Sequence, residues 1–246
     1  MIELPAPLVL LVPFFLGRIA IWGWIEWRHP AYQVNQRAVL LADVITMAVL
    51  LLITIPLIDA LYYRLSVQTW LPLHLGTWPL AVRVLLFIVL ADLGHYWVHR
   101  LMHTPLLWRV HRWHHSPTHT GWLSGSRESV LDRLLVNFPY FFFTPVIGQA
   151  PWWVWTGLLF LAGLRNDWMH LNVRWGWRWL EWLFVTPRYH HIHHSLDTAH
   201  HASNLSVFFS CWDRLFGTHH DPEGTQGRLA FGTGEKVSRL RLFIGL

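Results

Sequence analysis

Histidine is concentrated in two short stretches of this chain, and this concentration limits the folds that the chain can adopt. Seven of the 18 histidines lie between His95 and His119, and six more lie between His190 and His201. Neutral imidazole keeps one ring nitrogen free and is the commonest side-chain ligand for mid-row transition metals. The two stretches therefore predict a metal centre to which both contribute, so the fold must bring them together.

The spacing within each stretch favours ligand motifs on helices. His95, His99 and His103 are spaced four residues apart, which would place them on one face of a continuous helix. One HxxxH motif and two HxxHH motifs provide these candidate ligands: His95, His99, His111, His114, His115, His190, His193 and His194. This set exceeds what one octahedral ion can bind, so the spacing predicts two metal ions.

The composition is typical of a membrane protein. Of the 246 residues, 53% are hydrophobic and only 13% are charged, whereas about a quarter of the residues are charged in a soluble domain. The single cysteine, Cys211, excludes an intrachain disulfide and a thiolate metal cluster, so imidazoles and a few carboxylates must bind the metal. The sequence has no Gly-rich phosphate loop and no basic nucleic-acid face, so we expect no nucleic-acid partner.

The apolar runs predict an all-α integral membrane bundle of about four transmembrane helices. Runs at 8–25, 38–60 and 79–98 are each about long enough to cross the hydrocarbon layer. A further apolar segment, 134–164, is interrupted by Pro139, Pro145 and the sequence GQAP. A single crossing there would separate the two histidine stretches, so we expect a hairpin of two helices that returns to the same side.

We expect one multi-pass membrane domain with a histidine-rich helical cap. Its parts are the first three spans (1–98), the first histidine-box region (99–133), the membrane hairpin (134–164), and the second histidine-box cap with the C-terminal tail (165–246). Arg100, Arg109 and Arg112 lie within the first histidine stretch, which predicts a cap on the cytoplasmic side by the positive-inside rule. Tryptophan and arginine alternate across 168–184, which predicts an amphipathic helix at the membrane interface.

Two aspartates are candidates for orienting metal ligands. Asp92 lies three residues before His95, and Asp167 lies three residues before His170. A carboxylate at this helical spacing can accept a hydrogen bond from the imidazole nitrogen that does not bind metal. For Asp167 a solvated carboxylate is an equally good interpretation, whereas Asp92 lies late in an apolar span.

Four motifs together resemble the fatty acid hydroxylase/sterol desaturase superfamily of membrane di-metal oxygenases. They are HYWVH (95–99), HRWHHSPT (111–118), TPRYHHIHHS (186–195) and WDRLFGT (212–218), and the resemblance covers roughly residues 85–218. It implies a helical membrane bundle with a cytoplasmic histidine-lined cap, a di-iron centre, O2 as oxidant and a lipid-like substrate.

Carried over residue by residue, the resemblance implies the eight histidines above as ligands and adds His170, in the context WMHLN. Two positions differ from the family pattern. Asn204-Leu205-Ser206 replaces a frequent Asn-Tyr-Gly, and Arg174 stands where some members have another histidine, for which His119 and His201 are alternatives. Zinc can replace iron in recombinant material, because binding strength does not select iron over zinc.

The resemblance also implies an O2-dependent oxidoreductase that hydroxylates or desaturates a fatty acyl chain, a sterol or a related lipid. The electrons must come from an external cytochrome or ferredoxin with its reductase, because the chain has neither a nucleotide-binding glycine motif nor enough cysteines for an iron–sulfur cluster. Two other classes stay open: a membrane metal-binding or transport protein without oxygenase activity, and a hydrolytic zinc enzyme. The absence of HExxH counts against the zinc enzyme.

Overall fold

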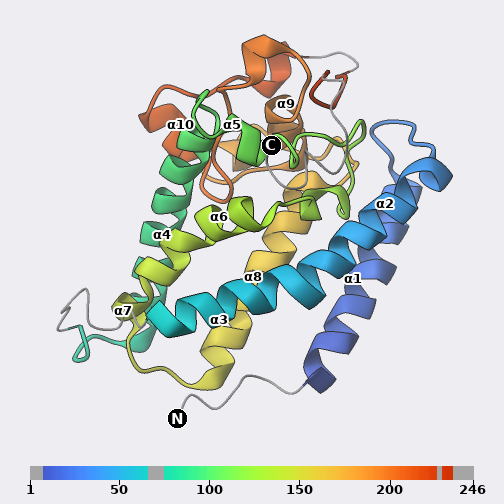
Figure 1. Cartoon of the computed structure of the whole chain (residues 1–246). Coiled ribbons are helices and arrows are strands. Elements are labelled where there is room, and N and C mark those ends of the chain that lie inside the picture. The colour runs from blue at the N-terminus through green and yellow to red at the C-terminus, as the bar shows by residue number, and fades with distance from the viewer. Residues whose placement is uncertain (1–7, 66–74, 226–228, 235–246) are drawn as a thin grey trace.

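The structure is a computed structural model that describes residues 8–65, 75–225 and 229–234. Within these ranges the chain is helical, with two isolated β-bridges and no longer strand. The prediction of an all-α fold is confirmed. Figure 1 shows three long helices, α1 (Leu8–Arg28), α4 (Leu80–Met102) and α8 (Trp152–His170), beneath a cap of short elements.

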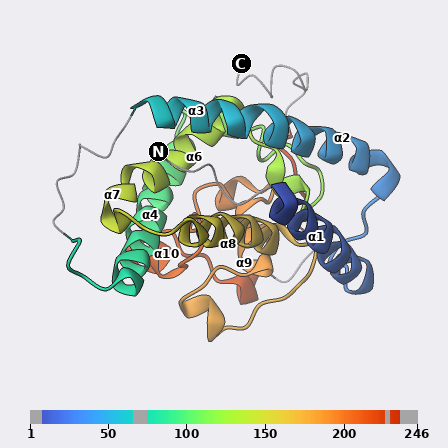
Figure 2. The same ribbon diagram turned by 90° about the horizontal axis from the view of Figure 1, so that it is seen from below.

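The second apolar run forms one continuous helical segment along one side of the bundle. It consists of α2 (Gln36–Val49), a π-helical turn η1 (Leu50–Thr54) and α3 (Ile55–Leu65). Seen from below, this segment runs along one edge of the bundle, and α8 lies between α4 and α1 (Figure 2). The α8 helix ends at His170.

Three segments of the described chain are long and apolar enough to cross a membrane: Val39–Ile58, Leu80–Met102 and Val130–Ile147. They correspond to the second and third predicted runs and to the first arm of the predicted hairpin. The first predicted run forms α1 and the second arm of the hairpin forms α8, and these two long helices stand beside the three spans.

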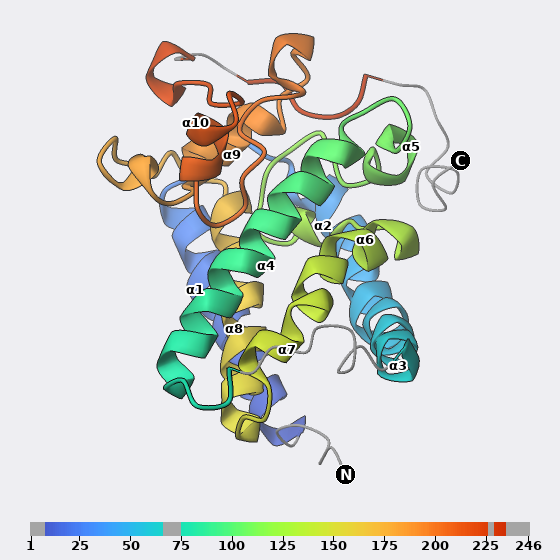
Figure 3. The ribbon, with the colours of Figure 1, turned by 90° about the vertical axis from the view of Figure 1, so that its left-hand side faces the viewer.

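The proline-rich apolar segment forms two helical arms joined by a turn. α6 (Val130–Phe142) continues into α7 (Thr144–Ile147), and after the turn the chain returns along α8. Gly148 makes the turn possible because its φ of 61° lies in the left-handed region, which a side chain disfavours. Figure 3 shows that α6 and α7 run away from the cap and that α8 runs back to it, so His170 lies at the cap end.

The core of the bundle is tightest between α4 and the first arm of the hairpin. Phe87 and Ala91 of α4 form a buried cluster with Val146 and Ile147. Gly94 allows this close approach, because a Cβ atom there would lie 2.8 Å from the Cβ of Pro139. The packing places the last turns of α4, which carry His99, beside α6.

The prediction of an amphipathic helix across 168–184 is wrong. α8 ends at His170, and the chain then runs without helix as far as the short 3-10 turn η4 (Leu180–Trp182). Leu171, Asn172 and Val173 are all buried, and three consecutive buried residues cannot share one face of a surface helix. Asn172 is held by its backbone N–H, which donates to the Glu26 carboxylate at 2.9 Å.

The remaining short elements form the cap. They are α5 (Trp108–His111), η3 (Ser124–Ser126), α9 (Pro187–His193), η5 (Thr198–His200), α10 (Cys211–Leu215) and η6 (Pro222–Gly224). α9 begins where two local signals coincide: the Thr186 side chain accepts from the Tyr189 N–H, and Pro187 occupies the first turn. The end of the C-terminal tail, residues 235–246, lies outside the described residues.

Candidate metal centre

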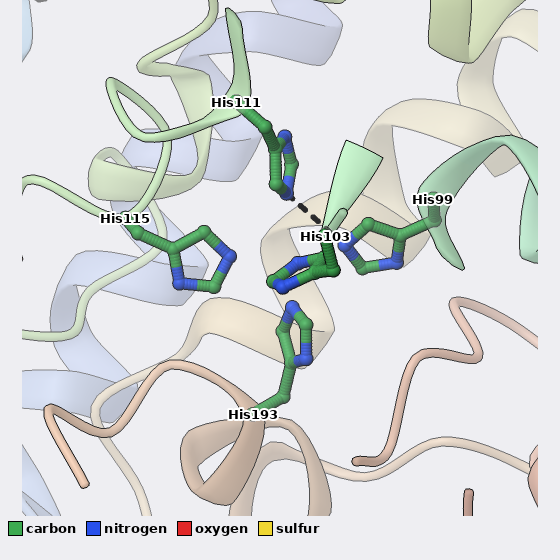
Figure 4. A group of neighbouring side chains, drawn as sticks. All are labelled: His99, His103, His111, His115 and His193. Atoms are coloured by element: carbon green, nitrogen blue, oxygen red, sulfur yellow. Dashed lines mark hydrogen bonds between the residues drawn. The ribbon is translucent and has the colours of Figure 1, made fainter. Parts of the chain in front are cut away.

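Five histidines from three parts of the chain converge on one point, and we call them the first histidine group. One ring nitrogen of each lies within 4.8 Å of the others: His99, His103, His111, His115 and His193. Figure 4 shows the five rings pointing toward one another. The end of α4, the α5 turn and the end of α9 bring them together.

Hydrogen bonds from outside the group orient three of these rings. The Nδ1 atom of His99 lies 2.6 Å from the Leu205 carbonyl oxygen, and that of His193 lies 3.0 Å from the Ser203 carbonyl oxygen. The Nδ1 atom of His111 lies 3.2 Å from the Asp132 carboxylate. The carbonyl partners of His99 and His193 can only accept, so these two Nδ1 atoms carry the proton and their Nε2 atoms keep a free lone pair toward the centre. An ionised Asp132 carboxylate would fix His111 in the same way.

Four further histidines form a second histidine group. Its members, again with one nitrogen each within 4.8 Å of the others, are His114, His170, His190 and His194. The Nε2 atom of His170 lies 3.3 Å from that of His114, 3.2 Å from that of His194 and 3.3 Å from that of His190. Ligands of a tetrahedral ion with bonds of 2.0–2.1 Å are about 3.3 Å apart, so the spacing fits a bound metal.

The two groups are direct neighbours. The rings of His115 and His194 stack with centroids 4.3 Å apart, and those of His111 and His114 are 5.0 Å apart. This contact makes a centre of two adjacent ions feasible. It also means that each group shields one side of the other from water.

Burial keeps the imidazoles of both groups neutral. Loss of solvation lowers the pKa of these histidines well below the ordinary value: His103, His111, His114, His115, His190, His193 and His194. Several buried ring nitrogens, including both of His103 and the Nε2 atoms of His115 and His193, have no hydrogen-bond partner. Buried polar atoms without a partner are costly, and a bound metal ion would satisfy them.

The structure places eight of the nine predicted histidines in the two groups. His95 belongs to neither, and its Nδ1 atom lies 3.0 Å from the Tyr140 hydroxyl. His103 belongs to the first group, although it is not among the nine histidines predicted as ligands. The four-residue spacing was the available signal, since His99 and His103 form a second HxxxH pair one turn further along α4.

The two alternative donors also lie outside the groups. His119 contacts the Asp43 carboxylate through its Nε2 atom at 2.8 Å. His201 stacks on Trp108 with ring centroids 5.7 Å apart. Neither histidine therefore completes either group.

The prediction that Asp92 and Asp167 orient ligand histidines is wrong. Asp92 accepts from the Phe209 N–H at 3.0 Å and from the Trp212 indole at 2.9 Å. Asp167 accepts from the Arg18 guanidinium and the Trp22 indole on α1. These bonds tie helices and cap together, while Asp132 on α6 is the carboxylate that contacts a histidine of the first group.

The WDRLFGT motif fixes the loop that supplies the two carbonyl groups. The Asp213 carboxylate accepts from the backbone N–H groups of Leu205 and Ser206, at 2.7 and 3.0 Å, and from the Thr218 hydroxyl at 2.7 Å. Asn204 adopts a φ of 51° in the same loop, a conformation that asparagine tolerates better than most residues. The motif thus positions the acceptors of His99 and His193 without contacting either ring.

The chain is similar in sequence to the proteins of one known family. The fatty acid hydroxylase family matches residues 84–218, which is more than half of the chain. An ornithine lipid hydroxylase of Rhizobium tropici is 33% identical over 173 residues, 63% of this chain and 49% of that protein. An alkylglycerol monooxygenase of Danio rerio is 26% identical over 225 residues, 88% of this chain and 48% of that protein.

A Delta(7)-sterol 5(6)-desaturase of Gibberella zeae is 26% identical over 204 residues, 79% of this chain and 59% of that protein. The chain thus spans about half the length of these curated relatives. No solved structure gives a significant match. The family match includes all nine histidines of the two groups and the WDRLFGT motif, and the chain therefore belongs to the fatty acid hydroxylase family.

Proposed function

We propose that this protein is a membrane-bound di-iron oxygenase that uses O2 and external electrons to hydroxylate or desaturate a lipid-class substrate. The observation that carries this proposal is the pair of adjacent groups of buried, neutral imidazoles at the end of the membrane helices. The names of the relatives support a lipid substrate, because they are an ornithine lipid hydroxylase, an alkylglycerol monooxygenase and a sterol desaturase. A fatty acyl chain or a sterol fits this class.

The proposed ligands are the nine histidines of the two groups. His99, His103, His111, His115 and His193 would hold one iron, and His114, His170, His190 and His194 would hold the other. Zinc would occupy the same sites in some recombinant preparations. Bound iron would supply the redox chemistry that O2 reduction and C–H cleavage require and that no side chain provides.

The residues of the chain would bind the iron ions, orient the imidazole ligands and keep water out of the centre. Asp132, Leu205 and Ser203 hold three imidazoles with Nε2 directed inward. Burial excludes the water that would otherwise compete with an apolar substrate. Because His99 lies near the end of the Leu80–Met102 span, a lipid chain would reach the centre without leaving the membrane.

The cap is proposed to face the cytoplasm, on the arginine distribution that the positive-inside rule uses. A cytochrome or ferredoxin with its reductase would then deliver electrons from that side. Hydroxylation and desaturation each consume O2, two electrons and two protons, so the same donor serves either reaction.

Comparative lipidomics of host membranes tests the proposal. We expect a lipid that gains one oxygen or loses two hydrogens in cells with the wild-type protein, but not with the double variant His193→Ala, His194→Ala. His29→Ala is the matched control, since His29 is exposed and lies outside both groups. If aerated, iron-replete cells with a competent donor show no lipid change, the metal-binding alternative replaces the oxygenase.

A further inference from the structure

Trp108, the first residue of α5, connects the cap surface with the first histidine group. Its ring centroid lies 5.3 Å from that of His115, 5.4 Å from that of His103 and 6.5 Å from that of His111. The side chain is half-buried, so the indole is accessible to solvent while it touches three of the histidines. It also stacks on His201, which is half-buried as well.

The surface around Trp108 has the character of a protein interface. Leu106 is 69% exposed and Arg109 is exposed, and exposed apolar, aromatic and arginine side chains are typical of such interfaces. Figures 1 and 3 show α5 at the cap end of the molecule, away from the far end of α8. Nothing in the described chain covers this part of α5 completely, since Trp108 and Arg109 both keep solvent contact.

The charge around Trp108 favours an acidic partner. From Leu93 to Arg127 the chain carries no aspartate or glutamate and four arginines, of which Arg127 is buried and pairs with Asp43. The other three arginines outnumber the one acidic residue near His201 in sequence, the exposed Asp197. An excess of positive charge at an interface speeds the approach of an acidic protein and orients it.

We infer that the surface formed by Leu106, Trp108, Arg109 and His201 is the docking site of the electron donor, and that Trp108 is the contact through which electrons reach the first histidine group. The inference rests on the proposed function. The partner is an acidic one-electron carrier protein. We call these four residues the Trp108 surface.

The electron balance defines what the Trp108 surface must do. Each docking event would oxidise the carrier by one electron, and iron held by the first group would accept that electron. Two such events, with O2 and two protons, convert R–H to R–OH and water. The indole lies in ring contact with His103 and His115, so an electron from a carrier docked on it crosses no layer of solvent.

Anaerobic stopped-flow kinetics test the role of Trp108 in electron transfer. Iron-loaded protein in detergent is mixed with a reduced, acidic plant-type ferredoxin, and ferredoxin oxidation is followed by its visible absorbance. We expect Trp108→Leu to slow this oxidation by roughly tenfold or more, as for the loss of a central interface tryptophan. Reduction by dithionite, which needs no docking site, should keep the wild-type rate, and the metal content should be unchanged.

Binding of oxidised ferredoxin to the zinc-loaded protein tests docking without any turnover. We expect Arg109→Glu to weaken this binding by about tenfold and to reduce its salt dependence. The matched controls are Trp179→Leu and Arg178→Glu, because Trp179 is 73% exposed and Arg178 is exposed elsewhere on the cap. Both controls should behave as the wild type in both experiments.

Trp108→Phe tests whether an aromatic ring at this position is sufficient for electron transfer. A phenyl ring retains aromatic contact, so we expect Trp108→Phe to transfer electrons at close to the wild-type rate. The inference is wrong if Trp108→Leu oxidises ferredoxin as fast as the wild type, if Arg109→Glu binds ferredoxin normally, or if Leu and Phe variants both lose metal. Wild-type protein that contains no ion reducible by dithionite would instead refute the proposed function itself.

Discussion

In three imidazoles of the first histidine group the two ring nitrogens have different surroundings. In His99, His111 and His193 the Nδ1 atom faces a carbonyl or carboxylate oxygen, which leaves Nε2 for the centre. The three acceptors come from α6 and from the loop before α10, not from the helices that carry the histidines. The orientation of the ligands is therefore a property of the tertiary structure.

Asp132→Asn should weaken metal binding by the first group by about 10–100-fold, because the amide is a poorer acceptor for the His111 Nδ1–H than the carboxylate is. Competition with a chelator of known affinity measures this change in the purified protein. Glu128→Gln is the control, since the Glu128 carboxylate contacts Arg133 at 3.0 Å and not a histidine. An unchanged dissociation constant in Asp132→Asn would show that His111 does not depend on this contact.

His103→Ala should remove about one of the two expected metal ions per chain, whereas His95→Ala should retain both. His103 should be needed because it lies in the first histidine group, whereas His95 lies outside both groups and contacts the Tyr140 hydroxyl. Elemental analysis of the two purified variants after iron reconstitution measures the metal content. The opposite pattern, with metal lost only in His95→Ala, would restore the HxxxH pair that the sequence first suggested.

At the scale of secondary structure elements, the apolar runs of the sequence predicted the long helices well, but the sequence predicted the contacts between elements poorly. The four-residue histidine spacing correctly indicated a helix through His95 and His99, which lie in α4, but it did not show that His99 and His103 are the residues that face the centre. The alternation of tryptophan and arginine after Trp168 suggested a surface helix, whereas the packing of Leu171 and Val173 overrides that local pattern. In both cases the neighbouring elements, and not the local periodicity, decided the outcome.

The ion pair between α1 and α8 should be costly to break from one side. The Arg18 guanidinium pairs with the Asp167 carboxylate, whose side chain is 0% exposed. Arg18→Leu should therefore lower the free energy of unfolding by about 3–5 kcal/mol, because it leaves a buried charge without its partner. Thermal unfolding in detergent measures the loss, and the double variant Arg18→Leu, Asp167→Leu should recover much of it.

A surface pair provides the comparison for this measurement. Arg178 and Glu223 pair at 3.5 Å, with side chains 72% and 44% exposed. Arg178→Leu should change the stability by about 0–1 kcal/mol, since solvent screens an exposed pair. Equal effects of Arg18→Leu and Arg178→Leu would mean that the α1–α8 pair contributes no more than a surface contact.

At the scale of the whole molecule, the meeting of the two histidine stretches was predictable, and the details of the centre were not. Shared metal binding requires both stretches at one end of the bundle. The 134–164 segment must therefore cross the membrane and return to the same side. The contacts that complete the site join residues far apart in the chain, such as Asp132 with His111, 21 positions away, and Leu205 with His99, 106 positions away. A single sequence carries no local pattern for such pairs.

The side of the membrane that the cap faces can be measured with the native cysteine. Cys211 is the single cysteine of the chain and lies in α10, a half-buried position on the cap (Figure 1). If the cap is cytoplasmic, a membrane-impermeant maleimide should leave Cys211 unlabelled in intact host cells and should label it after permeabilisation. Burial raises the pKa of the Cys211 thiol, so labelling should proceed faster as the pH rises above neutrality, where more thiolate forms.

Two controls make this labelling experiment decisive. Cys211→Ser should take up no label under any condition, which shows that the signal comes from Cys211. Labelling of the detergent-solubilised protein shows that the half-buried thiol is reachable at all. Given these controls, labelling of Cys211 in intact cells would place the cap outside the cytoplasm. An intracellular electron donor could then not reach the Trp108 surface, because α5 and α10 belong to the same cap.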